Sequence, residues 1–125
     1  MPTRLGIVEQ DRKLGERCCG PETRPRLDEA AAEALARDLG LLAHPVRLQL
    51  LDVLVRNGGR VCVCDLDAAV PVKQPTVSHH LKILREAGIV AAQRRGLWVY
   101  YHVREEALAR LRKRLAAALD AVAAP

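Results

Sequence analysis

The spacing of apolar residues predicts two amphipathic helices in the first half of the chain. Between residues 28 and 57, leucine and valine recur every three or four positions, and His44 and Pro45 interrupt the run. This spacing is typical of helices with one buried face. We expect the first helix to follow Asp28, a suitable N-cap. The second should begin with Pro45 and end near Gly58, because proline favours a first turn and glycine a helix end.

The next segment has the pattern of two helices joined by a tight turn. A short helix is expected from about Asp65 to Val70, closed by Pro71, and a longer one from Gln74 to Ala87, before Gly88. Two helices joined in this way form a helix-turn-helix.

The longer helix of this pair has an apolar and a polar face. Val77, Leu81 and Leu84 share one side. The opposite side and the flanks carry polar side chains that can hydrogen-bond base edges in a major groove, whereas a merely solvated helix more often alternates Glu and Lys. These polar residues are Thr76, Ser78, His79 and Lys82.

After Gly88 the apolar period changes from helical to two. Residues 89–93 and 97–103 read as strands, and Arg94, Arg95 and Gly96 lie between them. This pattern predicts a β-hairpin with a cationic tip. A hairpin directly after a recognition helix is a wing, and its arginines suit phosphate or minor-groove contact. An ordinary solvated turn is the alternative interpretation.

The last segment, residues 105–122, has a narrow leucine seam beside small alanines. The seam can pack within the chain or form a dimer interface together with the first helix. Two-fold symmetry would then place two recognition helices on successive major-groove faces of a palindromic site. The fold expected is mainly α with a β-hairpin, a winged helix-turn-helix that forms a homodimer through its first and last helices. The candidate interface residues are Leu35, Leu108, Leu111, Leu115, Leu119 and Val122.

Composition and charge favour a small DNA-binding protein. The chain has 125 residues, 50% of them hydrophobic, with no Phe and a net charge of +5. A core this small often gains stability by dimerisation, and the positive charge favours a phosphate polyanion. The chain has no apolar run long enough to span a bilayer, and residues 1–10 are polar, so we expect a cytoplasmic protein without a membrane partner.

Residues 1–26 differ from the rest of the chain. They are charged, and prolines and glycines interrupt them, so we expect a flexible arm before a winged domain over residues 27–125. The arm carries Cys18 and Cys19, whereas Cys62 and Cys64 precede the helix-turn-helix. Clustered thiols in a reducing compartment are more often metal ligands or redox sensors than disulfides. Inert buried thiols are the alternative.

With these elements in this order, residues 28–122 resemble the ArsR/SmtB family of metal-responsive repressors. The resemblance rests on four stretches, which are residues 42–48 (LAHPVRL), 62–66 (CVCDL), 74–82 (QPTVSHHLK) and 94–101 (RRGLWVYY). The family consists of dimeric repressors, not enzymes, which an inducer releases from double-stranded operator DNA.

The resemblance also implies roles for individual residues. Gln74, Thr76, Ser78 and His79 would face bases or phosphates, and Arg94 and Arg95 would hold the DNA backbone from the wing. His80 lies close to the apolar stripe of its helix, so we expect a buried, hydrogen-bonded histidine there in preference to a DNA contact.

The pattern of possible ligands favours a soft ion on thiolates. The last helix has no histidine, so a zinc or nickel site of the kind the family builds there is not expected. Cys62 and Cys64 resemble the thiolate site of the family's arsenic and cadmium sensors. Arsenic sensors that complete their site within this motif carry a third cysteine where this chain has Asp67.

A third sulfur would therefore come from Cys18 or Cys19 in the flexible arm. In related sensors a cysteine-bearing arm of this kind reaches the thiolate site of the other subunit. We expect As(III), or similarly Sb(III), because these ions prefer three thiolates. A site built from all four cysteines would suit Cd(II), Pb(II) or Zn(II). We expect ion binding to clamp the arm beside the helix-turn-helix and so to change the dimer geometry.

Three other functions are compatible with parts of this pattern. A repressor switched by an oxidant would join an arm cysteine to Cys62 or Cys64 in a disulfide. A thiol enzyme is less favoured, because the sequence has no Cys-x-x-Cys motif. A non-specific nucleoid protein would bind DNA with little sequence preference.

Overall fold

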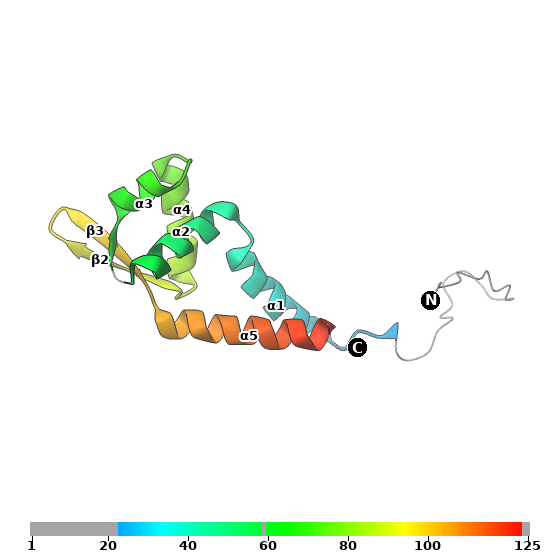
Figure 1. Cartoon of the computed structure of the whole chain (residues 1–125). Coiled ribbons are helices and arrows are strands. Elements are labelled where there is room, and N and C mark those ends of the chain that lie inside the picture. Colours follow the sequence, from blue (N-terminus) through cyan, green and yellow to red (C-terminus); the bar gives the residue numbers. More distant parts are fainter. Residues whose placement is uncertain (1–22, 59, 124–125) are drawn as a thin grey trace, which may run out of the picture.

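The computed structural model describes residues 23–58 and 60–123, which form a mainly helical domain with a small antiparallel sheet. The predicted mainly helical fold with a β-hairpin, a winged helix-turn-helix, is confirmed, and Figure 1 shows the arrangement. The elements in chain order are α1 (Glu29–Leu42), α2 (Pro45–Asn57), β1 (Val61–Cys62), α3 (Val63–Ala69), α4 (Gln74–Glu86), β2 (Val90–Arg95), β3 (Trp98–Val103) and α5 (Glu105–Ala123). None of the helices in these residues is both long and apolar enough to span a bilayer.

Local hydrogen bonds explain where the first two helices begin and end. Asp28 Oδ1 accepts from the backbone N–H of Ala31 at 2.8 Å, so Asp28 is the predicted N-cap of α1. Pro45 opens α2, and His44 Nδ1 caps it by accepting from the N–H of Val46 at 3.1 Å. Gly58 ends α2 with a φ of +59°, a left-handed conformation that glycine adopts without strain.

The hydrophobic core lies where α2, α3 and α4 pack against the sheet and the start of α5. The predicted apolar face of α4 is buried there, with Val77, Leu81 and Leu84 inaccessible to solvent. Aliphatic side chains supply this core, as expected for a chain with no Phe. The largest fully buried side chains are Leu50, Leu54, Leu66, Leu81, Leu84, Leu111, Val77 and Val90.

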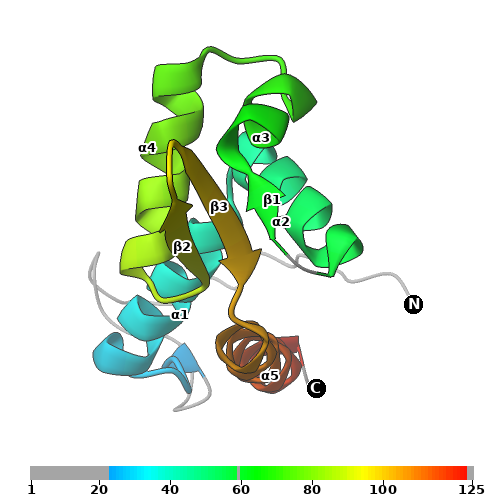
Figure 2. The same cartoon turned by 90° about the vertical axis from the view of Figure 1, so that its left-hand side faces the viewer.

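The sheet contains a strand that the sequence pattern did not predict. The strand order is β1-β3-β2, all antiparallel, so β1 adds a short third strand to the predicted hairpin (Figure 2). In β1, Val61 pairs with Tyr101 and Cys62 pairs with Tyr100. A strand of two residues has no measurable alternation, so periodicity alone cannot reveal it.

Two expected boundaries were wrong by a few residues. Helix α3 starts at Val63 rather than near Asp65, so Cys64 lies in its first turn. Arg94 and Arg95 belong to β2 rather than to the turn, because Arg95 pairs with Trp98 and the loop consists of Gly96 and Leu97. The cationic residues therefore flank the tip of the hairpin on its first strand.

Helices α1 and α5 contact each other, and the hairpin projects from the opposite end of the molecule (Figure 1). Arg114 of α5 forms a two-pronged ion pair with Asp38 of α1, with N–O distances of 3.1 and 3.2 Å. The molecule thus has a helical end, formed by α1 and α5, and a wing end.

Candidate DNA-binding surface and thiol site

The outward face of α4 carries the side chains predicted to contact DNA. Burial of Val77, His80, Leu81 and Leu84 fixes the rotation of the helix. The first turn contains no acidic residue, so the helix N-terminus can approach a phosphate without repulsion. Lys82 lies 3.9 Å from Glu86, an exposed pair that contributes little energy and leaves the ammonium group available to DNA. The exposed residues of the predicted set are Gln74, Thr76, Ser78, His79 and Lys82.

The wing presents the two predicted arginines close to its tip. Arg94 and Arg95 are both exposed near the end of β2. The Nε atom of Arg94 donates to the carbonyl oxygen of Gly96 at 3.3 Å, which holds this side chain beside the turn. Among the ion pairs of the described residues none involves Arg94 or Arg95. Both guanidinium groups can therefore approach phosphate without losing a carboxylate partner.

A partly buried polar junction connects α1, α2 and α4. His80 of α4 is buried, with 5% of its surface exposed, and its Nδ1 accepts from Arg47 Nε of α2 at 3.2 Å. Arg47 Nη1 also donates to the carbonyl oxygens of Gly40 and Leu41 in the last turn of α1, at 2.9 and 3.3 Å. These carbonyls lack partners within their own helix. The prediction that His80 is buried and hydrogen-bonded is confirmed.

Burial and nearby positive charge hold His80 in its neutral form. Burial is the largest cause of its lowered pKa, followed by His44, Arg47 and His79. The ring of His44 lies 4.1 Å from that of His80, and the ring of His79 lies 5.4 Å away, between centroids. A neutral Nδ1 can accept the bond from Arg47, whereas a protonated one cannot. The sequence pattern did not reveal this junction, because Arg47 and His80 are 33 positions apart.

Cys62 and Cys64 bring two sulfur atoms together at the start of the helix-turn-helix. Their Sγ atoms lie 2.7 Å apart, and Cys64 is exposed to solvent. The hydrogen bond to Cys62, with smaller contributions from burial and nearby charge, raises the pKa of the Cys64 thiol. A soft ion binds thiolates, so binding here would release protons.

The described residues do not complete a metal site around these two thiols. They contain no group of three or more Cys, His, Asp or Glu side chains placed to hold one ion. Cys18 and Cys19, the remaining predicted ligands, lie outside the described residues. Asp67 is half-buried, and burial raises the pKa of its carboxyl group. Two convergent thiols fit a soft ion, provided that a further sulfur comes from another segment.

The predicted dimer residues differ in their exposure. Leu111 and Leu115 are buried in the protomer's own core, and Leu35 and Leu108 pack partly against it. Leu119 and Val122 are exposed on α5, as is Leu39 on α1. The leucine seam therefore serves the protomer's core in its first half and leaves an apolar surface in its second half.

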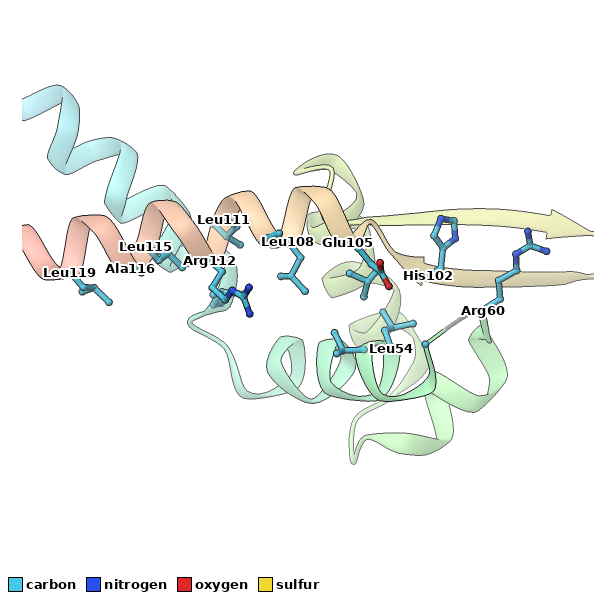
Figure 3. Close-up of a pocket in the computed structure, with 15 residues that line it drawn as sticks. Leu54, Arg60, His102, Glu105, Leu108, Leu111, Arg112, Leu115, Ala116 and Leu119 are labelled. Atoms are coloured by element: carbon cyan, nitrogen blue, oxygen red, sulfur yellow. The ribbon is translucent and has the colours of Figure 1, made fainter.

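An open apolar groove runs along α5 from Glu105 to Leu119 (Figure 3). It has a volume of about 960 Å³ and lies between α5 and the end of α2. Leu54 and Val55 line it from α2, and Leu108 and Leu119 from α5. Arg60, His102, Glu105 and Arg112 add polar groups to its lining.

Fold and surface together define a winged helix-turn-helix DNA-binding protein. A basic wing and a polar recognition helix lie on a small helical domain, and comparisons with known proteins agree with this class. Residues 44–92 match the sequence profile described as "Bacterial regulatory protein, arsR family". An uncharacterised HTH-type transcriptional regulator, MJ1325 of Methanocaldococcus jannaschii, is 41% identical over 71 residues, which cover 57% of this chain and 79% of that protein. The chain belongs to the ArsR family of DNA-binding transcriptional repressors.

Other similar proteins have more specific names. The arsenic resistance transcriptional regulator ArsR1 of Pseudomonas putida is 43% identical over 65 residues, which span 52% of this chain and half of that protein. The crystal structure of the AntR antimony-specific transcriptional repressor matches with a TM-score of 0.56 and 31% sequence identity. The matched region covers 85% of this chain and 97% of the AntR chain. A homodimeric winged helix-turn-helix domain, Mb0332 of Mycobacterium bovis, has a TM-score of 0.55 and 27% identity, and it covers 80% of this chain and 92% of its own.

Proposed function

We propose that this chain is a metalloid-responsive repressor that binds operator DNA as a dimer and releases it when As(III) or Sb(III) binds cysteine thiolates. The observation that carries this proposal is that the Cys62 and Cys64 side chains bring their sulfur atoms together. These thiols lie where β1 ends and the helix-turn-helix begins. The names of the arsenic and antimony regulators to which the chain is similar support the same class of ion.

The ligand set of the proposed site includes one cysteine from the first segment of the chain. Trivalent arsenic and antimony prefer three thiolates in a pyramid, so Cys62 and Cys64 need one more sulfur. Cys18 or Cys19 supplies it, from an arm formed by residues 1–26. Ion binding in this form requires reduced thiols, which the cytoplasm provides.

The two thiols are connected to both DNA-binding elements. Cys62 pairs with Tyr100 in β3, the second strand of the wing. Cys64 lies in the first turn of α3, and α3 contacts the recognition helix α4. An ion that binds both sulfurs and the arm fixes the position of β1 relative to α3. The favoured position changes the geometry of the dimer, so that its two recognition helices no longer match the spacing of the operator half-sites, and this change lowers the affinity for DNA.

The proposed dimer forms through the helical end of the molecule. Leu39, Leu119 and Val122 expose apolar surface on α1 and α5, and the groove beside α5 adds to it. Burial of this surface against a second copy would contribute a hydrophobic free energy of about 25 cal/mol for each Å² removed from water, which opposes the entropy cost of association. The homodimeric Mycobacterium bovis domain supports a dimer as the state of this fold.

The proposed function is tested by operator binding at increasing arsenite concentration. A DNA duplex is first selected by the wild-type protein from a random pool and labelled with a fluorescent dye. The labelled duplex is titrated with protein at each arsenite concentration, and its fluorescence anisotropy reports the bound fraction. Arsenite and antimonite should lower the affinity of the wild type about a hundredfold, a coupling of about 2.7 kcal/mol. Cys62→Ser and Cys64→Ser should bind the duplex normally and lose the response. Wild-type affinity that neither ion changes would contradict the proposal.

The same titration distinguishes the alternative inducers. In a three-thiolate site, either Cys18→Ser or Cys19→Ser retains the arsenite response and so serves as an internal control. If Cys18→Ser and Cys19→Ser each abolish the response to Cd(II), Pb(II) or Zn(II), the site uses four thiolates. A redox switch would be identified if peroxide released the protein from the duplex in metal-free buffer and arsenite had no effect on binding.

A further inference from the structure

The tip of the wing exposes two large apolar side chains. Leu97 is 89% exposed and Trp98 is 55% exposed. They follow Gly96, whose φ of +62° opens a two-residue loop closed by the Arg95–Trp98 pair. Glycine at a positive φ in the first loop position is typical of a tight hairpin turn whose twist matches that of its strands. The loop thus presents Leu97 at the apex of a regular hairpin.

The proposed dimer interface does not explain these two residues. Leu39, Leu119 and Val122 are exposed on α1 and α5, and Val55 lines the groove beside α5. The hairpin lies at the end of the molecule opposite to α1 and the C-terminal half of α5 (Figure 1). A second copy that packs on the helical end leaves the tip of the wing in water.

The surroundings of the apolar tip are complementary to DNA. Residues 87–104 contain three arginines and no carboxylate. Arg95 is directly opposite Trp98, and cross-strand partners of this kind project from the same face of a hairpin. Arg94 is held against the Gly96 carbonyl at the same tip. An apolar tip flanked by guanidinium groups favours a partner with an anionic edge and an apolar interior, and duplex DNA has both.

We propose that Leu97 and Trp98 enter the minor groove of the bound duplex as an apolar wedge, while the neighbouring arginines hold the phosphates. Apolar wedges open base steps in this groove and bend the duplex, and the bend allows more contact with the protein. Pyrimidine–purine steps deform most readily. The wing therefore favours DNA sequences that deform readily at its contact site, although no hydrogen bond to a base is made there. This inference depends on the DNA binding of the family and is independent of the ion.

The salt dependence of DNA binding tests the wedge without metal. Leu97→Ala should lower the affinity for the selected duplex about tenfold and leave the slope of affinity against salt unchanged, because no phosphate contact is lost. Leu97→Met, which keeps the apolar volume, should bind as the wild type does. Leu48→Ala, a leucine 50% exposed on α2, is the matched control and should have no effect. Unchanged affinity of Leu97→Ala, or a loss accompanied by a lower salt slope, would overturn the proposal.

Trp98 supplies a second, direct readout, because it is the only tryptophan of the chain. Its emission should be quenched on binding the duplex, and its accessibility to acrylamide should fall. Energy transfer between dyes at the two duplex ends should show a bend that Leu97→Ala reduces. If saturating DNA changes neither the emission of Trp98 nor its quenching by acrylamide, the proposal is overturned. The tip would then be expected to bind a protein surface instead of DNA.

Discussion

The bond from Arg47 Nε to His80 Nδ1 exists only while the histidine is neutral. Burial and the neighbouring His44, Arg47 and His79 lower the pKa of His80 below its ordinary 6.5. The unfolded chain therefore binds a proton at a pH where the folded chain does not. The stability due to the neutral ring is complete above about pH 6.5 and is lost as the pH falls toward the lower pKa of the folded state.

Replacement of His80 should remove this part of the pH dependence. His80→Asn keeps an acceptor near Arg47 and does not titrate. Between about pH 7.5 and about pH 5.5, the free energy of unfolding should fall more for the wild type than for His80→Asn. Urea denaturation at each pH measures the difference between the two proteins. Equal slopes for wild type and His80→Asn would contradict the role given to the buried ring.

At the scale of elements, Arg47 connects the last turn of α1 to the recognition helix. Arg47→Ala leaves the buried His80 acceptor and two helix carbonyls without their donor. The expected loss of stability is about 2 to 3 kcal/mol, measured by chemical denaturation. Arg56→Ala is the control from the same helix, because its ion pair with Asp52 is exposed; its cost should stay below about 1 kcal/mol. Similar losses of unfolding free energy for both variants would mean that the junction stabilises the fold no more than an exposed ion pair does.

The recognition helix and the wing should fail in different ways when they are altered. Arg95→Ala should weaken binding to all duplexes and lower the salt slope by about one, because one phosphate contact is lost. Ser78→Ala, on the exposed face of α4, should instead change the order of preferred sequences. Selection from a random pool with each variant distinguishes the two effects. A changed preference in Arg95→Ala without a change in salt slope would reverse the assigned roles.

Most elements were predictable because local chemistry determines their ends. Asp28, Pro45 and Gly58 fix helix boundaries through caps and backbone preferences, which a sequence shows directly. Strand β1 was missed because its partner is β3, about 40 residues away. The same pairing places Cys62 beside the wing. Leu111 and Leu115 illustrate another limit, since a leucine seam alone does not indicate whether its partner is the same chain or a second copy.

At the scale of the whole molecule, the helical end should determine the oligomeric state. Leu119→Asp places a charge on an exposed apolar position of α5, so it should convert the dimer to a monomer while the fold is retained. Sedimentation equilibrium measures the mass, and circular dichroism checks the fold. Leu48→Asp, at an exposed leucine of α2, is the control and should remain dimeric. A dimeric Leu119→Asp protein would place the interface elsewhere.

The central claim is that soft-ion binding at the thiols and DNA binding at the wing end are coupled. Coupling between two sites is reciprocal, so DNA must weaken ion binding by the same factor by which the ion weakens DNA binding. The most direct measurement is the dissociation constant of arsenite with and without saturating duplex. It should rise about a hundredfold with DNA bound, equivalent to about 2.7 kcal/mol. An arsenite affinity that is the same with and without DNA would contradict the account.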